Sequence, residues 1–244
     1  MLFSENDPAP VLSHGVSDGG GILLTCEHAG HAVPSALGDL GVPQADLRDH
    51  IGWDPGALAV AQVLADRLQT RLVAQRYSRL VIDCNRPRSA PDLIPEVSDT
   101  RAVPGNVALS VEDRDRRWHL THQPFHAEVA HQRAHHRALL SIHSFTPQKR
   151  DGAPRATQIG VLARDGNRLF THLMTELPTL WPGQVVANDP YEIEDDSDYT
   201  IPVHAERHGL PHALLEIRND LIADAAGVIR MAEALSAALK GYRL

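Results

Sequence analysis

Two histidines, each in a strand-like apolar run, are the residues of this sequence best placed to do chemistry. His28 lies in the run at residues 22–30, and His143 lies in the run at residues 139–145. In open α/β sheets, ligands bind at the carboxyl ends of the strands, so these two imidazoles are expected to converge. Because imidazole is the commonest protein ligand of metal ions, the pair predicts a metal or substrate site.

A third ligand would complete a catalytic metal site. Zinc in such sites takes three nitrogen or oxygen ligands from the protein and keeps one position open for water. Asp54 is our candidate for the third ligand, and Glu27 and His31, which stand beside His28, are the alternatives. Asp54 also precedes Pro55, which is an ordinary position for an aspartate that caps a helix.

A carboxylate in a late apolar strand is the candidate general base. Glu216 and Arg218 share one face of the strand predicted at residues 213–217. A carboxylate there is costly unless it is paired or has a raised pKa, and a raised pKa suits a general base. The alternative is a buried ion pair between Glu216 and Arg218 without a catalytic role.

Substrate recognition is assigned to polar residues that follow apolar runs. Asn85 and Arg86 come directly after the apolar run at residues 79–84. The Arg86 guanidinium is suited to a two-point contact with a substrate carboxylate, and Asn85 adds an orienting amide. Alternatively, Arg86 bonds loop carbonyls. Arg218 and His204 are further candidates for contact with the substrate, and for His204 a packing role is equally consistent with the sequence.

Other motifs are weak or absent. His122 and His126 have the spacing of a helical metal pair, but Pro124 lies between them and the sequence His-Glu-x-x-His is not formed. No Gly-x-Ser-x-Gly, phosphate-binding or dinucleotide-binding glycine motif occurs. The sequence therefore gives no support to a serine hydrolase, a nucleotidase or a dinucleotide-dependent enzyme.

The elements that must position these residues alternate between strand and helix patterns. We expect strands at residues 22–30, 71–75, 79–84, 139–145, 158–163, 184–187 and 213–217, and helices at residues 55–68, 110–137, 167–177 and 223–240, with an interruption at Pro124. Residues 86–107 lack either periodicity and are expected to form an excursion over the site. This alternation predicts a three-layer α/β fold, a mixed, mostly parallel sheet with helices on both faces.

Composition limits the class of protein. A chain of 244 residues with 43% hydrophobic content is expected to fold as one domain over residues 1–244. The net charge of −8 without a basic stripe argues against nucleic acid as a partner and favours a small molecule. Cys26 and Cys84 lie in apolar runs, as expected for two reduced, buried thiols. No secretory pattern or run of 18 apolar residues is found, so we expect a cytoplasmic protein without a membrane partner.

Several of these segments resemble, in the same order, the N-formylglutamate amidohydrolase family. The matching segments are Cys-Glu-His-Ala-Gly at 26–30, Asp-His-Ile-Gly-Trp-Asp at 49–54, Asp-Cys-Asn-Arg-Pro at 83–87, Ile-His-Ser-Phe-Thr-Pro at 142–147 and Leu-Glu-Ile-Arg-Asn-Asp-Leu at 215–221. The resemblance spans roughly residues 20–222. It implies a fold related to zinc-dependent carboxypeptidases and aspartoacylase-like deacylases, in which a metal-activated water attacks an amide carbonyl.

Carried over to this sequence, the resemblance implies one zinc ion at His28 and His143, a substrate clamp at Asn85 and Arg86, and Glu216 as the base. The carboxypeptidase pair His-x-x-Glu is not kept, because His31 stands three residues after His28. The implied reaction removes a formyl or other small acyl group from an N-acyl amino acid such as N-formylglutamate. The alternatives are a metal-dependent amidase or carboxypeptidase acting on other N-acyl amino acids or short peptides, and a protein that only binds an acidic metabolite.

Overall fold

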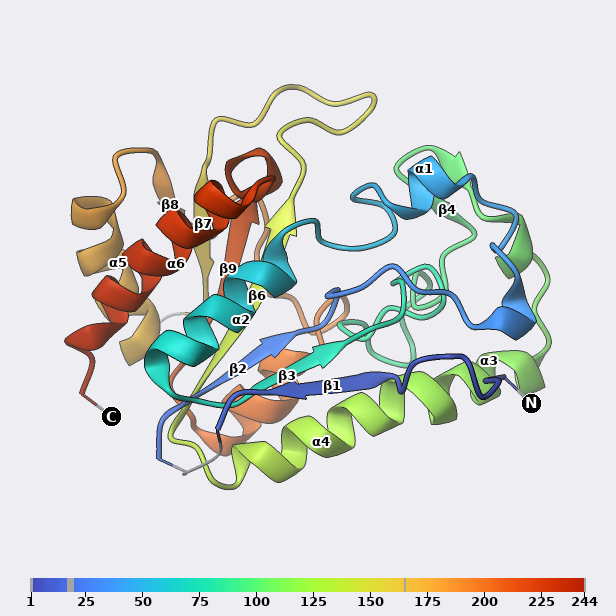
Figure 1. Ribbon diagram of the computed structural model, residues 1–244, viewed down its shortest axis with the longest axis horizontal. Coiled ribbons are helices and arrows are strands. Elements are labelled where there is room, and N and C mark those ends of the chain that lie inside the picture. Colours follow the sequence, from blue (N-terminus) through green and yellow to red (C-terminus); the bar gives the residue numbers. More distant parts are fainter. Residues whose placement is uncertain (1, 17–19, 165, 244) are drawn as a thin grey trace.

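A mixed seven-stranded sheet in the order β1-β3-β2-β6-β9-β7-β8 forms the centre of the molecule (Figure 1). The computed structural model describes residues 2–16, 20–164 and 166–243. The strands of this sheet are β1 (Val11–His14), β2 (Ile22–Cys26), β3 (Leu72–Gln75), β6 (Ala138–Phe145), β7 (Ile159–Leu162), β8 (Val185–Ala187) and β9 (His212–Arg218). β1 runs antiparallel to β3 and β7 runs antiparallel to β9, whereas the other neighbouring pairs are parallel. The predicted mixed, mostly parallel sheet is confirmed.

Helices cover both faces of the sheet, which confirms the predicted three-layer arrangement. On one face, apolar side chains of the strands pack against α2 (Ala57–Leu68), α5 (Arg168–Leu180) and α6 (Ala225–Lys240). On the other face they pack against α4 (Gln123–Arg133) and the π-helical turn η4 (Ile201–Ala205). The side chains of Asn167 and Asp224 cap α5 and α6, so both helices begin close to the predicted positions.

The remaining helical segments lie mostly in the loops. They are η1 (Ser35–Leu37), α1 (Gln44–Leu47), η2 (Pro104–Asn106), α3 (Val111–Arg117), η3 (Trp118–His122), η5 (Glu206–His208) and η6 (Asn219–Ile222). Ser110 caps α3, at the start of the helical region expected from residue 110 onward. The expected interruption at Pro124 takes the form of the π-helical turn η3, because proline lacks the N–H that a regular helix needs and sits in the first turn of α4.

The prediction of a strand at residues 79–84 is wrong. This segment forms turns, in which Val81 N–H donates to Ser78 O and Asp83 N–H donates to Leu93 O. Its apolar residues Leu80, Val81 and Ile82 are buried against other loop residues, in a cluster that includes Leu93 and Val103. An apolar run was therefore a sign of burial here and not of pairing in the sheet.

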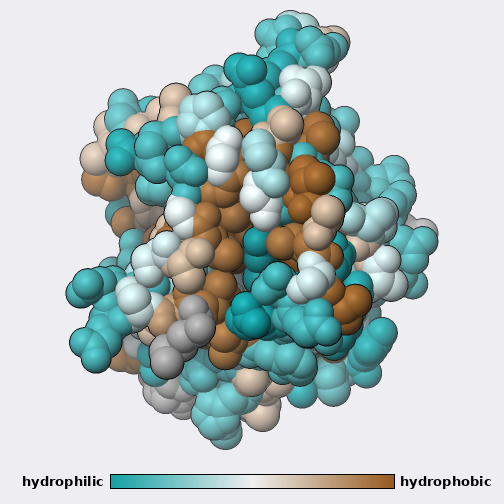
Figure 2. Space-filling model, turned by 90° about the vertical axis from the view of Figure 1, so that its right-hand side faces the viewer, coloured by the Kyte–Doolittle hydropathy of each residue, from teal (hydrophilic) through white to brown (hydrophobic). Residues whose placement is uncertain are grey.

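Residues 86–107 form the expected excursion. Part of it is a small antiparallel hairpin of β4 (Val97–Ser98) and β5 (Arg101–Ala102). These loops gather at the end of the molecule that carries α1, β4 and α3 (Figure 1), and Figure 2 shows this end, where hydrophilic side chains surround a band of apolar ones. The short strand β1 was not predicted, because a proline-rich segment precedes it and only one strand pairs with it.

No helix among residues 2–16, 20–164 and 166–243 is long and apolar enough to cross a membrane. Cys26 and Cys84 are buried free thiols, as predicted.

The buried Arg117 side chain holds the excursion at residues 86–107 in place, and its loss should destabilise the fold. Its guanidinium is buried and donates to Val81 O at 3.0 Å, Asn106 Oδ1 at 2.7 Å and Gly105 O at 3.3 Å. Arg117→Met would leave these acceptors buried without a donor, at a cost of about 1–3 kcal/mol for each unsatisfied group. We expect the free energy of unfolding, measured by urea denaturation, to fall by about 2 kcal/mol or more.

The neighbouring Arg116→Met variant is the matched control. Arg116 is half-exposed and pairs with Asp113 on the helix surface, so its loss should cost less than about 0.5 kcal/mol. Equal losses in the two variants would contradict an anchoring role for Arg117.

Candidate active site

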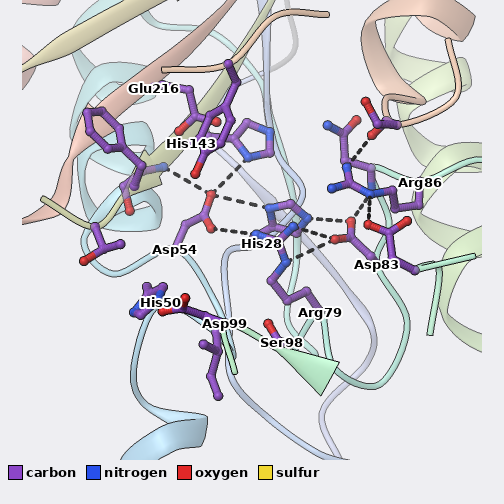
Figure 3. A pocket seen from close by; sticks show the side chains of 18 of the residues that line it. His28, His50, Asp54, Arg79, Asp83, Arg86, Ser98, Asp99, His143 and Glu216 are labelled. Carbon is purple, nitrogen blue, oxygen red and sulfur yellow. Dashed lines mark hydrogen bonds and ion pairs between the residues drawn. The ribbon is translucent and has the colours of Figure 1, made fainter. Parts of the chain in front are cut away.

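Three buried side chains from separate parts of the chain converge at the carboxyl edge of the sheet (Figure 3). His28 follows the end of β2, His143 lies in β6, and Asp54 lies in the turn that precedes α2. The candidate ligand atoms of the three residues all lie within 4.8 Å of one another. The parallel pairing of β2 with β6 brings the two histidines together, as their positions in the sequence predicted.

Each imidazole turns Nδ1 toward Asp54 and Nε2 toward a second carboxylate. The Nδ1 atoms of His28 and His143 lie 3.4 and 3.0 Å from Asp54 Oδ2. On the opposite side of the rings, His28 Nε2 lies 2.7 Å from Asp83 Oδ1 and His143 Nε2 lies 2.9 Å from Glu27 Oε2. Histidines that bind metals commonly have such a carboxylate behind the ring, because it fixes the tautomer and the orientation of the ring.

Asp54 is held in place by its neighbours on both sides. Its N–H donates to His28 O at 2.9 Å, and its Oδ2 accepts a hydrogen bond from Ser144 N–H at 3.1 Å. It does not act as a helix cap: α2 begins at Ala57 after Gly56, whose φ of 82° and close approach to Ile222 O leave no room for a side chain.

The two alternatives to Asp54 lie elsewhere. Glu27 contacts the far nitrogen of His143 and accepts a hydrogen bond from Ser141 Oγ at 2.6 Å. His31 packs against Trp53, with ring centroids 4.9 Å apart, and does not belong to the group of His28, Asp54 and His143.

The donor set of His28, Asp54 and His143 fits a divalent metal ion. His28 Nδ1 is buried and makes no hydrogen bond to any residue that the structure describes, although its Nε2 is fully engaged. Two imidazole nitrogens and one carboxylate oxygen match the ligand types of zinc sites that keep an open position. The three residues can therefore hold such an ion.

The buried acids are kept ionised by the bases between them. Burial raises the pKa of Asp54 and of Glu27, but their contacts with the histidines outweigh it: the pKa of Asp54 falls below its usual range, and that of Glu27 falls to about 2. Burial also raises the pKa of Asp83, but the Arg79 guanidinium, which donates to Asp83 Oδ2 at 2.7 and 3.1 Å, holds it well below its usual range. His143 in turn has a raised pKa, because Asp54 and Glu27 overcome the effect of burial.

Glu216 is the buried carboxylate without such a partner. It lies opposite His143 in the pairing of β9 with β6, and Figure 3 shows it beside His143. Its Oε2 is buried without a hydrogen-bond partner in the described part of the chain. Burial, followed by the charge of Asp54, raises its pKa to about 7 in spite of the nearby histidines.

The alternative ion pair between Glu216 and Arg218 is not formed. The Arg218 guanidinium pairs with Asp220, at 2.8 Å from Nε to Oδ1, and donates to Arg155 O at 3.1 Å. Arg218 is also not among the residues that line the cavity around the site, so it lies apart from the other predicted substrate contacts.

The cavity in front of the three converging side chains has a volume of about 340 Å³ and is lined mostly by polar groups. Asn85 and Arg86 line it, as do Arg79, Asp83 and Glu216. The excursion closes one side of the cavity, where His50 Nε2 lies 2.7 Å from Asp99 Oδ2 at the tip of the β4–β5 hairpin. A cavity of this size can accommodate a small molecule.

Asn85 and Arg86 are engaged differently. The Asn85 amide donates to Asp198 Oδ1 at 2.8 Å and accepts hydrogen bonds from the backbone of Tyr199 and Thr200, so it fastens this loop to the cavity wall. Arg86 contacts Asp92 through Nε and Ser197 O through Nη1, and no hydrogen bond to a described residue involves its Nη2.

His204 is buried but does not line the cavity. It lies 2.9 Å from His126 Nδ1, in a cluster of aromatic side chains behind Asn85 and Arg86. His122 and His126 belong to the same cluster and contact the carbonyls of Arg86 and Cys84.

Sequence reasoning missed Asp83, Arg79 and the role of Glu27. Asp83 stands two residues before Asn85 in a segment already recognised, and Glu27 adjoins His28, so both were within the motifs. No spacing rule marks a residue that supports a histidine from another loop, and the contact of Asp83 with His28 spans 55 positions.

The fold and the site together define an α/β protein with a candidate metal centre of two histidines and one aspartate at the carboxyl edge of its sheet. Comparison with family models gives a match to the family described as N-formylglutamate amidohydrolase over residues 20–223. The chain belongs to this amidohydrolase family, as its motifs indicated.

Two solved structures are similar along nearly the whole chain. A protein of Agrobacterium tumefaciens shares 36% sequence identity with a TM-score of 0.93, covering 98% of this chain and 97% of its own. The N-formylglutamate amidohydrolase of Ralstonia eutropha shares 21% identity with a TM-score of 0.66, covering 95% and 96%, which shows a common fold. A comparison with curated proteins gave no match.

If the contact of Asp83 with His28 orients a metal ligand, Asp83→Asn should weaken metal binding. An amide in place of the carboxylate gives the imidazole a poorer acceptor and removes the charge that fixes it. Losses of this kind typically weaken metal affinity by about 10- to 100-fold. Zinc affinity can be measured by competition with a chromogenic chelator.

The control for this experiment is Asp66→Asn. Asp66 lies 2.9 Å from His14 Nε2 at an exposed position, so it is an aspartate–histidine pair away from the site. We expect wild-type zinc affinity in this variant, and wild-type affinity in Asp83→Asn as well would refute the orienting role.

The raised pKa of Glu216 predicts a pH-dependent stability in the metal-free protein. Glu216 keeps its proton up to a pH of about 7 when folded but only to about 4.5 when unfolded, so its contribution to stability falls as pH rises through this window. The free energy of unfolding of the wild type should fall by roughly 3 kcal/mol between pH 4.5 and 7, at about 1.4 kcal/mol per pKa unit. Glu216→Gln should not show this fall. Urea denaturation of chelator-treated protein at several pH values measures it.

Glu112→Gln, at an exposed position in α3, should keep the wild-type pH profile. Identical profiles for the wild type and Glu216→Gln would show that Glu216 does not titrate in this range.

Proposed function

We propose that this protein is a metal-dependent amide hydrolase that removes a formyl or other small acyl group from an N-acyl amino acid such as N-formylglutamate. Membership of the amidohydrolase family supports the reaction class. The observation that carries the proposal is the convergence of two imidazole Nδ1 atoms and Asp54 beside Glu216, whose buried Oε2 has no hydrogen-bond partner among the described residues.

His28, Asp54 and His143 would hold the metal ion, and we propose zinc. When bound, such an ion lowers the pKa of water and polarises a carbonyl as a Lewis acid. Asp83 and Glu27 keep the two histidines oriented through their Nε2 atoms. Arg79 supports the arrangement from the side, since it pairs with Asp83 and its Nη1 lies 3.6 Å from Asp54 Oδ1.

Glu216 would move the proton. Its carboxylate accepts a proton from the attacking water and then delivers it to the amide nitrogen of the leaving amino acid, so the carboxylate is regenerated. A pKa near the working pH suits both steps, because the group must accept and release a proton in one cycle. Such general acid–base catalysis is typically worth about 10²–10⁴ in rate.

Arg86 would bind a carboxylate of the substrate. It lines the cavity, its Nε and Nη1 contact Asp92 and Ser197, and its Nη2, which makes no hydrogen bond to a described residue, would contact the substrate carboxylate. Asn85 acts on the loop at Asp198 to Thr200 and so shapes the wall of the cavity. A fixed guanidinium orients the acyl group toward the metal site and Glu216.

The test combines metal content with turnover of N-formylglutamate. We expect the purified protein to contain close to one zinc ion per chain, and His28→Ala and His143→Ala to lose it together with activity. Glu216→Gln should keep the metal while kcat falls by about 10² or more. Metal is measured by elemental analysis, and hydrolysis by the release of formate.

His172→Ala is the matched control, because His172 is a half-buried histidine that contacts Ala238 O on the far side of the molecule. It should retain both metal and activity. Full metal occupancy in His28→Ala and His143→Ala, or normal turnover in a folded Glu216→Gln variant, would refute the proposed mechanism.

A further inference from the structure

A cluster of buried aromatic side chains lies directly behind the segment that carries Asn85 and Arg86. The imidazoles of His122 and His126 come from η3 and α4, and that of His204 comes from η4. All three are at least nine-tenths buried, and none of them lines the cavity. They do not belong to the candidate metal centre, and the proposed reaction does not use them.

The imidazoles contact the carbonyls on either side of Asn85. His126 Nε2 lies 2.7 Å from Cys84 O, and His122 Nε2 lies 3.1 Å from Arg86 O. Because a carbonyl oxygen only accepts hydrogen bonds, both Nε2 atoms must carry the proton. Two histidines one helical turn apart thus donate to two carbonyls that flank a single residue.

The third histidine, His204, forms a hydrogen bond with His126. His126 Nδ1 lies 2.9 Å from His204 Nε2, and since His126 already donates from Nε2, its neutral ring accepts at Nδ1 and His204 donates. Burial lowers the pKa of His122 and of His204 to about 4 and lowers that of His126 well below its usual value. The neutral His126 ring that this pair of contacts requires is therefore present at neutral pH.

The same cluster supports the second loop that contacts Arg86. The Tyr199 ring packs against His126 and His122, with centroids 4.5 and 5.0 Å apart. The Tyr199 N–H donates to Asn85 Oδ1, and Arg86 Nη1 donates to Ser197 O in the same loop. Two of the segments that hold Arg86, its own backbone and the loop at Ser197 and Tyr199, thus contact these aromatic rings, whereas Asp92 contacts Nε from a third segment.

We propose that His122 and His126, with His204 behind them, are positioning residues that set the Arg86 guanidinium to receive a substrate carboxylate. This inference rests on the proposed function, because it takes Arg86 to contact the substrate. The imidazoles act through the backbone of residues 84–86 and touch neither the substrate nor the metal site.

The experiment compares two substrates of similar shape, N-formylglutamate and its diamide, in which neutral amides replace the carboxylates. His122→Phe keeps a ring that stacks on Trp118, where the centroids are 3.7 Å apart, but removes the donor to Arg86 O. We expect KM for N-formylglutamate to rise about tenfold, with kcat and the kinetics of the diamide little changed, because only the contact with the carboxylate is disturbed. His122→Gln, which restores an N–H donor, should return KM toward the wild-type value.

His212→Phe is the matched control: His212 is buried and contacts Leu210 O at 2.8 Å, at the opposite end of β9 from Glu216. This variant should leave unchanged the ratio of the KM values for N-formylglutamate and its diamide. If His122→Phe does not fold, His126→Phe, which removes the donor to Cys84 O, is measured in the same way. An unchanged ratio in a folded variant, or an equal change in His212→Phe, would overturn the inference.

A calorimetric titration with L-glutamate separates this inference from the proposed function. We expect the wild type to bind L-glutamate and His122→Phe to bind it about tenfold more weakly. A wild-type protein that binds L-glutamate but hydrolyses neither substrate would refute the proposed function and leave the positioning role standing. Equal binding by the wild type and His122→Phe, or no binding by either, would overturn the positioning role.

Discussion

The burial of several carboxylates at one edge of the sheet is the constraint on which the rest of the site depends. Glu27, Asp54 and Asp83 are all buried, and an unpaired ionised carboxylate in such a place is costly. His28 lies between Asp54 and Asp83, and His143 lies between Asp54 and Glu27, so each imidazole contacts two carboxylates. Removal of any one member would leave a buried charge unmatched. The positions of the candidate ligands are therefore fixed by the attraction between opposite charges as well as by packing.

The topology of the sheet brings these charges together. β2, β6 and β9 are adjacent and parallel, so groups near their carboxyl ends emerge side by side. The remaining wall is supplied by loops without regular structure, which are ordered by internal hydrogen bonds such as those of Arg117 and Asn85. The sheet thus fixes the positions of the groups proposed for catalysis, whereas the loops fix the positions of the groups proposed for substrate binding.

The sequence predicted what depends on periodicity and on strand ends. Most of the order of strands and helices, the convergence of His28 and His143, and the position of Glu216 in an apolar strand could be inferred, because each follows from a local pattern. The failures concern contacts that the alternation along a strand does not encode. The run at residues 79–84 is apolar because loops bury it, and Arg218 turns to Asp220, a choice that spacing along a strand does not reveal. The sequence also did not decide the third candidate ligand among Asp54, Glu27 and His31, because only the turn before α2 places Asp54 beside the two histidines.

Histidine serves two purposes in and behind this site, and the partner of each nitrogen decides which. An imidazole flanked by carboxylates on both nitrogens, as in His28 and His143, is held as a potential metal ligand. An imidazole that donates to a carbonyl in an uncharged environment, as in His126, stays neutral and can only hold the backbone in place. Glu216 shows the opposite case: the neighbouring histidines contact other acids, and its buried Oε2 has no hydrogen-bond partner in the described part of the chain. Burial therefore raises its pKa to about 7, so the group can gain and lose a proton near neutral pH.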